Sequence, residues 1–140
     1  MDRYNRAVEL SSEEIAAFLD ETHTLVLATH RGDGSIHQTT VWYRWDGHAF
    51  WLSTNRDRAK YRHIARNPRV SVLVDAPERE TAVSASGVAK VAATDEASYD
   101  GARAIIARYV SDPDAYLGDR AGEQRVLLRI RPDKLVSWKP

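Results

Sequence analysis

Positive charge is concentrated in one short stretch of the chain, between residues 56 and 66. This stretch holds five Lys or Arg residues and a single acid, and it directly follows Ser53-Thr54-Asn55, whose side chains carry hydroxyl and amide groups. Backbone N–H groups at the start of a helix bind phosphate well when guanidinium or ammonium groups lie beside them. We therefore expect an anion site that uses Arg58 and Lys60.

A solvated helix face is the alternative interpretation of the same stretch, because a run of charge often does nothing more than face water. Cations in the first turn are unfavourable with the helix dipole, so Arg58 and Lys60 are easier to explain if an anion binds there. Nucleic-acid binding through this face is a further alternative. The 20 basic and 20 acidic residues of the chain balance, which argues against it.

Other reactive side chains do not form recognisable catalytic patterns. No histidine pair has the H-E-x-x-H spacing of a zinc site, so we expect no metal and place the histidines on the surface or on strands. The chain has no cysteine, which excludes disulfides and thiolate catalysis. G-x-S-x-G, P-loop and G-x-G-x-x-G motifs are also missing. No catalytic residue is predicted. The five histidines are His23, His30, His37, His48 and His63.

Four tryptophans are the other notable feature. Trp42, Trp45 and Trp51 fall on neighbouring predicted strands, and Trp138 lies near the end of the chain. In a small domain such residues usually fill the core or a dimer interface. Stacking against a planar aromatic ligand is the functional alternative.

The elements that position these residues begin with a helix and three strands. Ser11 and Glu14 have capping-box spacing, which predicts a helix with Ile15, Phe18 and Leu19 on one face. Apolar and β-branched runs predict strands at 24–29, 36–45 and 48–54, arranged as an antiparallel meander whose last turn is Asp46-Gly47. The basic stretch then has helical spacing, with Tyr61, Ile64 and Ala65 on one face, and it ends before Asn67-Pro68.

The second half of the chain is also mainly strand. Alternating patterns predict strands at 70–74 and 81–91, the latter with a bulge or close approach at Gly87. A third helix is expected from Thr94 to about Pro113, followed by strands at 125–131 and 135–138. This order lacks βαβ alternation. It predicts a single mainly β domain over 1–140, an antiparallel barrel of six or seven strands with three short helices.

With these elements in order, the chain resembles the pyridoxamine 5′-phosphate oxidase-like split β-barrel superfamily. The resemblance rests on DGSIHQTTVWY at 33–43, a strand ending in Leu52-Ser53-Thr54, RAKYRHIARNPRVSVLVD at 58–75 and SGVAKV at 86–91. It extends from Ser11 to Trp138. Within the superfamily, the chain is most similar to the actinobacterial flavin/deazaflavin oxidoreductase B group.

The resemblance implies a homodimer with cofactor sites in grooves between the protomers. The cofactor ring would lie against two strands and the phosphate against the following helix, with a contribution from the other protomer near Thr81. The implied cofactor-binding residues are Thr39, Thr40, Val41, Trp42, Ser53, Thr54, Asn55, Arg58, Ala59, Lys60, Tyr61 and Thr81.

The same resemblance implies an oxidoreductase that uses deazaflavin coenzyme F-420, with FMN as the alternative cofactor. A conjugated small molecule is the expected substrate; a cofactor carrier or haem-binding relative without turnover is the alternative. Many relatives have proline where this chain has Ile36 and Thr40, and the chain ends without the R-x-x-R-L-x-P-like segment of vitamin B6 oxidases, so we do not expect that reaction. No signal peptide or membrane span is recognisable, and a cytoplasmic protein is expected.

Overall fold

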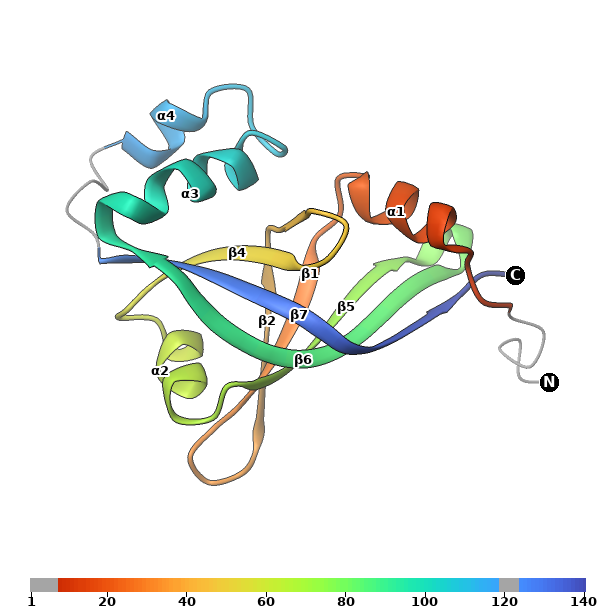
Figure 1. Cartoon of the computed structure of the whole chain (residues 1–140), viewed down its shortest axis with the longest axis horizontal. Helices are drawn as coiled ribbons and strands as arrows, with labels where there is room; N and C mark the ends of the chain where they lie inside the picture. The colour runs from red at the N-terminus through yellow and green to blue at the C-terminus, as the bar shows by residue number, and fades with distance from the viewer. Residues whose placement is uncertain (1–7, 119–123) are drawn as a thin grey trace.

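Seven antiparallel strands curl into a half-barrel in the computed structural model, which describes residues 8–118 and 124–140 (Figure 1). This confirms the predicted mainly β barrel. The strands follow the order β2-β1-β5-β6-β7-β4-β3, and each neighbouring pair is antiparallel. Their bounds are β1 (Leu25–His30), β2 (Ile36–Val41), β3 (Arg44–Trp45), β4 (Phe50–Asn55), β5 (Arg69–Ala76), β6 (Thr81–Thr94) and β7 (Arg125–Trp138).

The barrel is open along one line, because the two end strands of the sheet do not pair with each other. We call the gap between β2 on one side and β3 and β4 on the other the seam. Sequence reasoning predicted one strand over 36–45 paired with 48–54, and this is wrong. The short β3 alone pairs with β4, as Arg44 with Trp51 and Trp45 with Phe50.

Tyr43 explains why the predicted strand breaks. Its side chain is fully buried, and its hydroxyl donates to the Leu19 carbonyl over 2.7 Å. Its backbone N–H donates to the Tyr109 hydroxyl over 3.2 Å instead of to a neighbouring strand. The chain therefore leaves the sheet after Val41 and crosses the seam before β3 begins.

The helices lie around the sheet. The capping box that begins α1 is confirmed, since Ser11 Oγ accepts from the Glu14 N–H and Glu14 Oε1 accepts from the Ser11 N–H. The predicted third helix is shorter than expected, and Asp112-Pro113, interpreted as its end, begins a further helix in which Asp112 is the N-cap. The helices are α1 (Ser12–Asp20), α2 (Ala59–Arg66), α3 (Tyr99–Ile106) and α4 (Pro113–Leu117), with 3₁₀ turns at Pro77–Arg79 and Asp95–Ser98.

Helix α2 buries most of the predicted face, since Tyr61 and Ile64 pack against the core. Ile64 is buried as expected, but Ala65 is exposed and His63 is buried in its place. The His63 Nδ1 lies 2.9 Å from the Thr29 Oγ1 of β1. The expectation of a surface histidine is therefore wrong for His63, because this hydrogen bond lets its ring pack between α2 and the sheet.

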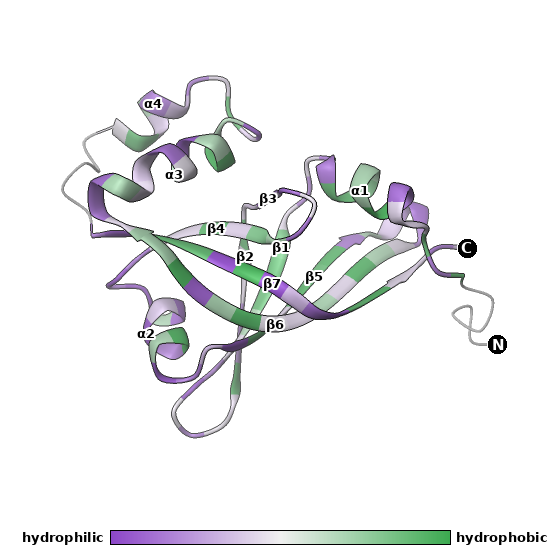
Figure 2. Cartoon of the chain, in the orientation of Figure 1, coloured by the Kyte–Doolittle hydropathy of each residue, from purple (hydrophilic) through white to green (hydrophobic). Residues whose placement is uncertain are grey.

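Hydrophobic and polar residues alternate along the strands (Figure 2), and the core is built from buried residues of β1, β4, β5, β6 and β7. Phe18 and Leu19 of α1 contribute to it, as predicted. The predicted irregularity at Gly87 is also confirmed, because the β6–β7 register shifts there and a Cβ would lie 2.3 Å from the Arg131 carbonyl oxygen. The two strands predicted at the end of the chain are one continuous β7, with this shift in its middle.

Candidate functional site

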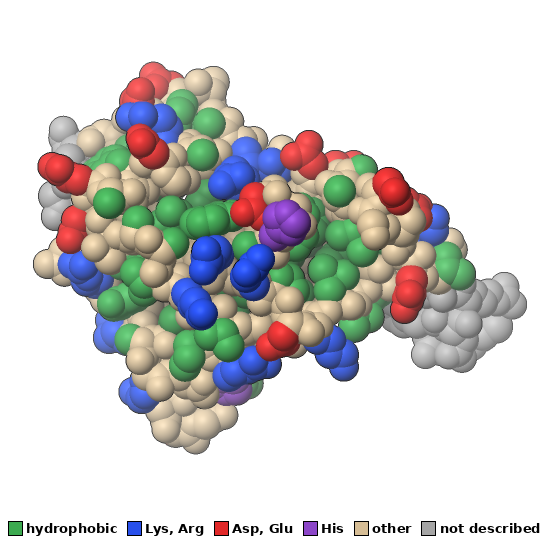
Figure 3. Space-filling view, viewed as in Figure 1, with side chains coloured by type: hydrophobic (Ala, Val, Ile, Leu, Met, Phe, Trp, Pro, Cys, Tyr) green, Lys and Arg blue, Asp and Glu red, His purple; other side chains and the backbone are tan. Residues whose placement is uncertain are grey.

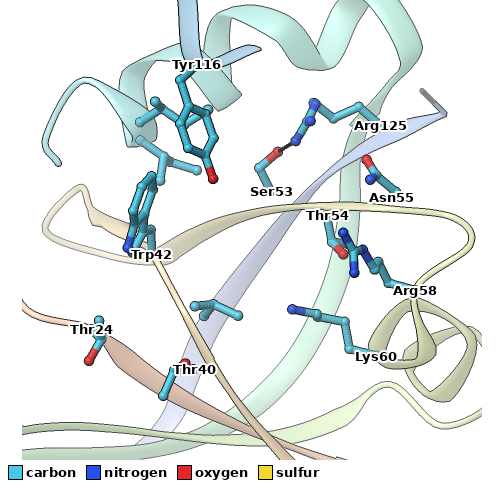
Figure 4. Close-up of a pocket in the computed structure, with 13 residues that line it drawn as sticks. Thr24, Thr40, Trp42, Ser53, Thr54, Asn55, Arg58, Lys60, Tyr116 and Arg125 are labelled. Atoms are coloured by element: carbon cyan, nitrogen blue, oxygen red, sulfur yellow. Dashed lines mark hydrogen bonds between the residues drawn. The ribbon is translucent and has the colours of Figure 1, made fainter. Parts of the chain in front are cut away.

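A cavity of about 360 Å³ opens at the seam, where residues from both sides of the open barrel face one another (Figure 4). The lower part of its wall comes from β2, β4 and the start of α2. Helices α3 and α4 and the beginning of β7 close the remainder. The lining residues are Thr24, Thr40, Val41, Trp42, Ser53, Thr54, Asn55, Arg58, Lys60, Ile105, Ile106, Tyr116 and Arg125.

The start of α2 presents two cations to this cavity. Arg58 occupies the N-cap position without a side-chain capping bond, and no acid lies in the first turn. Lys60 extends from the helix into the cavity (Figure 4). Burial lowers the pKa of Lys60, and the nearby Arg58 charge lowers it further. An anion at this position would offset the repulsion between the two cations and satisfy the helix start.

Polar side chains of β4 and β7 form a second part of the wall. Arg125 Nη1 donates to Ser53 Oγ over 2.9 Å, and Arg125 is only 6% exposed. Asn55 is 9% exposed, and its Oδ1 atom has no hydrogen-bond partner among the described residues. Buried polar atoms are rarely left without a partner, so this wall is suited to a ligand with polar edges.

Aromatic and aliphatic side chains form the opposite part of the wall. Trp42 stacks on Tyr109 with 4.7 Å between ring centroids and an interplanar angle of 3°, and it lies 5.3 Å from Tyr116. Tyr109 is itself held in place, since its hydroxyl donates to the His23 carbonyl over 2.6 Å. With Ile105 adjacent, the cavity has one flat apolar side that suits a planar ring.

The other tryptophans of the predicted hairpin have structural roles. Trp45 packs against Phe50 with a centroid distance of 4.6 Å. The Trp51 indole N–H donates to Asp46 Oδ2 over 2.7 Å, which stabilises the β3–β4 turn. Neither residue lines the cavity.

Eight of the twelve residues implied by the resemblance line the cavity, and four do not. Thr39 lies on β2 outside the lining, Ala59 lies in the first turn of α2, and Tyr61 packs against the core. Thr81 begins β6, where its hydroxyl donates to the Arg79 carbonyl over 3.1 Å. The eight lining residues are Thr40, Val41, Trp42, Ser53, Thr54, Asn55, Arg58 and Lys60.

Sequence reasoning missed five lining residues, of which Arg125, Tyr116 and Thr24 carry polar groups. Arg125 is far from Ser53 in sequence, and only the β4–β7 pairing brings them together. Ile105 and Ile106 are buried residues of α3 that also border the cavity. Thr24 precedes β1 and has no pattern that marks it.

The described residues do not contain a metal site or a membrane-spanning helix. In residues 8–118 and 124–140, no three His, Cys, Asp or Glu residues are grouped so that they could hold a metal ion. Across the same ranges, no helix has the length and apolar character needed to cross a bilayer. None of the five histidines lines the cavity.

Comparison with known proteins assigns the family. Residues 11–139 match the family model described as pyridoxamine 5′-phosphate oxidase. The chain belongs to the pyridoxamine 5′-phosphate oxidase family. Within this family fold, the seam cavity joins a helix start that suits a phosphate to a flat wall that suits a ring.

Solved structures agree with this assignment. A conserved hypothetical protein of Mycobacterium tuberculosis, Rv2991, is 33% identical, with a TM-score of 0.77 over 93% of this chain and 85% of that one. A protein described as an F420 reductase is 27% identical, with a TM-score of 0.70 over 85% of this chain and 93% of its own. The haem storage protein HutZ of Vibrio cholerae shares the fold at 21% identity, with a TM-score of 0.70 over 93% and 96% of the two chains.

Proposed function

We propose that this protein is an oxidoreductase that binds deazaflavin coenzyme F-420 in the seam cavity and transfers a hydride to a conjugated small molecule. The observation that carries the proposal is that one cavity holds both a two-cation helix start and a flat aromatic wall. The 27% identity to a protein described as an F420 reductase supports it.

Each part of the wall has a distinct role in this proposal. Arg58 and Lys60 bind the phosphate of the cofactor, together with N–H groups at the start of α2. Ser53, Thr54 and Asn55 hold one edge of the ring, opposite Thr40 and Val41. The bound ring supplies the hydride chemistry, while the protein orients the substrate and excludes water. Trp42 and Tyr116 border the space for the substrate.

FMN is the second candidate cofactor. Its phosphate suits the same two cations, and the family model that matches this chain is described as pyridoxamine 5′-phosphate oxidase. Haem is less well supported by the cavity, because Tyr116 is the one residue of an axial-ligand type among the described residues that line it, and no His, Cys or Met does so. FMN and haem therefore serve as competing ligands in the test below.

We also propose that two copies of the chain form a homodimer that completes the groove. Large apolar side chains are exposed on the strands, with Ile36 at 49%, Val91 at 48% and Val136 at 46%. Figure 3 shows hydrophobic side chains beside Lys and Arg on one face of the molecule. A second copy would cover such side chains, and Thr81 is the residue we expect it to contribute. Light scattering after size-exclusion chromatography tests this, and a monomeric mass at micromolar concentration contradicts it.

The first experiment is a titration of the protein with F-420, FMN and haemin, followed by tryptophan fluorescence. Trp42 lines the cavity, so a bound ring should quench it, and Trp42→Phe should remove most of the quenching. Trp45→Phe is the matched control, since Trp45 lies outside the cavity. Fluorescence quenching at micromolar or lower concentrations of F-420 supports the proposal. A preference for FMN or haemin, or no binding, contradicts it.

A turnover assay tests the catalytic part of the proposal. Reduced F-420 is mixed with the protein and conjugated carbonyl or nitro compounds, and reoxidation of the coenzyme is followed by its absorbance. Substrate-dependent reoxidation is expected only when protein is present. Tight binding of F-420 without any turnover would instead identify a cofactor carrier.

A further inference from the structure

The contact between Ser53 and Arg125 determines which role the serine can have. Arg125 Nη1 donates to Ser53 Oγ over 2.9 Å, so the serine oxygen acts as an acceptor in this pair. A hydroxyl group carries one proton to donate and two acceptor lone pairs. No residue in the described part of the chain accepts the Ser53 proton. The hydroxyl is therefore left to donate toward the cavity that it lines (Figure 4).

Asn55 gives a second, independent indication that this wall meets a ligand. Residues 53 and 55 lie two apart on β4, so both side chains point to the same face of the strand. Asn55 lines the cavity at 9% exposure, and its Oδ1 has no partner among the described residues. A buried amide oxygen without a partner is costly, and a ligand that donates a hydrogen bond would remove that cost.

The guanidinium group also changes how strongly Ser53 donates. Arginine stays charged at all accessible pH values, and a hydroxyl that accepts a bond from a cation becomes a better donor. The low exposure of Arg125, at 6%, limits the screening of this effect by water. Ser53 is thus a polarised donor that faces the ring position of the proposed site.

We propose that Arg125 is a positioning residue that directs the Ser53 hydroxyl to an acceptor atom on the ring of the bound cofactor. This inference rests on the proposed function. Ser53 would hold an acceptor atom of the ring, and its hydrogen bond would be stronger to the more electron-rich reduced form than to the oxidised form. Ser53 keeps its proton throughout. The pair therefore favours the reduced ring over the oxidised ring and raises the reduction potential of the bound cofactor.

The test compares dissociation constants for oxidised and reduced F-420, and for the two forms of FMN, in wild type, Ser53→Ala, Arg125→Met and the double variant. Losing one hydrogen bond should weaken binding of the oxidised ring about threefold and of the reduced ring about tenfold. Because Arg125 acts through Ser53, the double variant should bind each ring with the same affinity as the single variant that binds it less tightly. A spectroscopic titration of the potential should show the matching decrease.

Several results would overturn the inference. Equal weakening of both redox forms would leave Ser53 as a simple contact. Additive losses in the double variant would show that Arg125 contacts the ligand by itself. If wild type binds neither cofactor, the proposed function fails and this inference fails with it. If wild type binds and the variants match it, the inference alone fails.

Two further variants guard against a folding defect. Arg125→Lys keeps a charged donor, and partial recovery of the preference for the reduced ring is expected relative to Arg125→Met. Ser71→Ala is the matched control, because Ser71 is an exposed strand serine outside the cavity lining, and its affinities should equal those of wild type. If Arg125→Met does not fold, equal affinities of Ser53→Ala and wild type for the reduced ring would still overturn the inference.

Discussion

Lys60 extends from α2 into the cavity (Figure 4), and its removal is a direct test at the residue scale. We expect Lys60→Ala to weaken cofactor binding by about 1 to 3 kcal/mol, because a charge-assisted hydrogen bond is lost. Isothermal titration calorimetry measures this. Lys90→Ala is the matched control, since Lys90 is exposed on β6 outside the cavity. An unchanged affinity of Lys60→Ala would place the phosphate elsewhere.

The same lysine should make cofactor affinity depend on pH. Burial first, and the Arg58 charge second, lower the pKa of Lys60 in the free protein. A bound phosphate favours the charged amine, so affinity is greatest below this pKa and decreases as the pH rises through it. The decrease should begin at a lower pH than for an exposed lysine.

Titrations between pH 7 and 10 measure this dependence. Lys60→Arg keeps its charge over the whole range, and its affinity should change less with pH than that of wild type. Equal pH dependence of the two proteins would show that another group titrates.

At the scale of the elements, the bulge between β6 and β7 depends on Gly87. An added Cβ would lie 2.3 Å from the Arg131 carbonyl oxygen, and backbone atoms cannot move aside without distorting both strands. We expect Gly87→Ala to lower the free energy of unfolding by about 1 to 3 kcal/mol, as overpacking does elsewhere. Urea denaturation followed by tryptophan fluorescence measures it.

Gly32→Ala provides the control for that measurement. Its Cβ would approach the Arg66 guanidinium at 3.0 Å, and the end of this exposed side chain can move away. The two substitutions add the same methyl group, so a similar loss in both would contradict the role given to the bulge.

Elements whose determinants are local in sequence were predictable, and those fixed by distant partners were not. The capping box of α1 uses residues three apart, and the bulge at Gly87 follows from an alternating pattern with one glycine. The break after Val41 depends on the hydrogen bond from Tyr43 to Leu19, and the pattern of hydrophobic residues in the sequence does not indicate it. The burial of His63 likewise depends on Thr29, which lies on another strand.

The candidate site divides in the same way. Arg58 and Lys60 were recognisable because a helix start and its cations are contiguous. Ser53 and Arg125 are 72 residues apart, and only the pairing of β4 with β7 makes them neighbours. A single sequence contains no information on that pairing, since several strands of this chain have similar patterns.

For the whole molecule, contacts between α1 and the end of β7 join the two ends of the described chain. Lys139 donates to Glu14 Oε2, Leu10 N–H donates to Ser137 Oγ over 3.0 Å, and Val8 pairs with Lys139. The bond from Lys139, followed by the Ser11 N–H, lowers the pKa of Glu14 from 4.5 to about 2.

The contact between Lys139 and Glu14 should make the free energy of unfolding depend on pH. A lowered pKa means that the stabilisation is present above the usual value of 4.5 and is lost as the pH decreases through about 2. Glu14→Gln keeps the capping geometry without the charge, so its melting temperature should be below that of wild type at pH 7, and the difference should shrink steadily as the pH decreases from 4.5 to about 2. Glu13→Gln is the matched control. A difference between wild type and Glu14→Gln that is as large at pH 2 as at pH 7 would contradict this account.

The open seam affects how easily a ligand can enter the cavity and how fast nearby amide protons exchange. In the described part of the chain, no strand pairs across the gap between β2 and β4, so the gap can widen without breaking any ladder hydrogen bond. The amide protons that border the gap on these two strands should exchange rapidly with deuterium in the free protein. A ligand or a second copy seated there would slow that exchange, while amides within the β5, β6 and β7 ladders would be protected in both states.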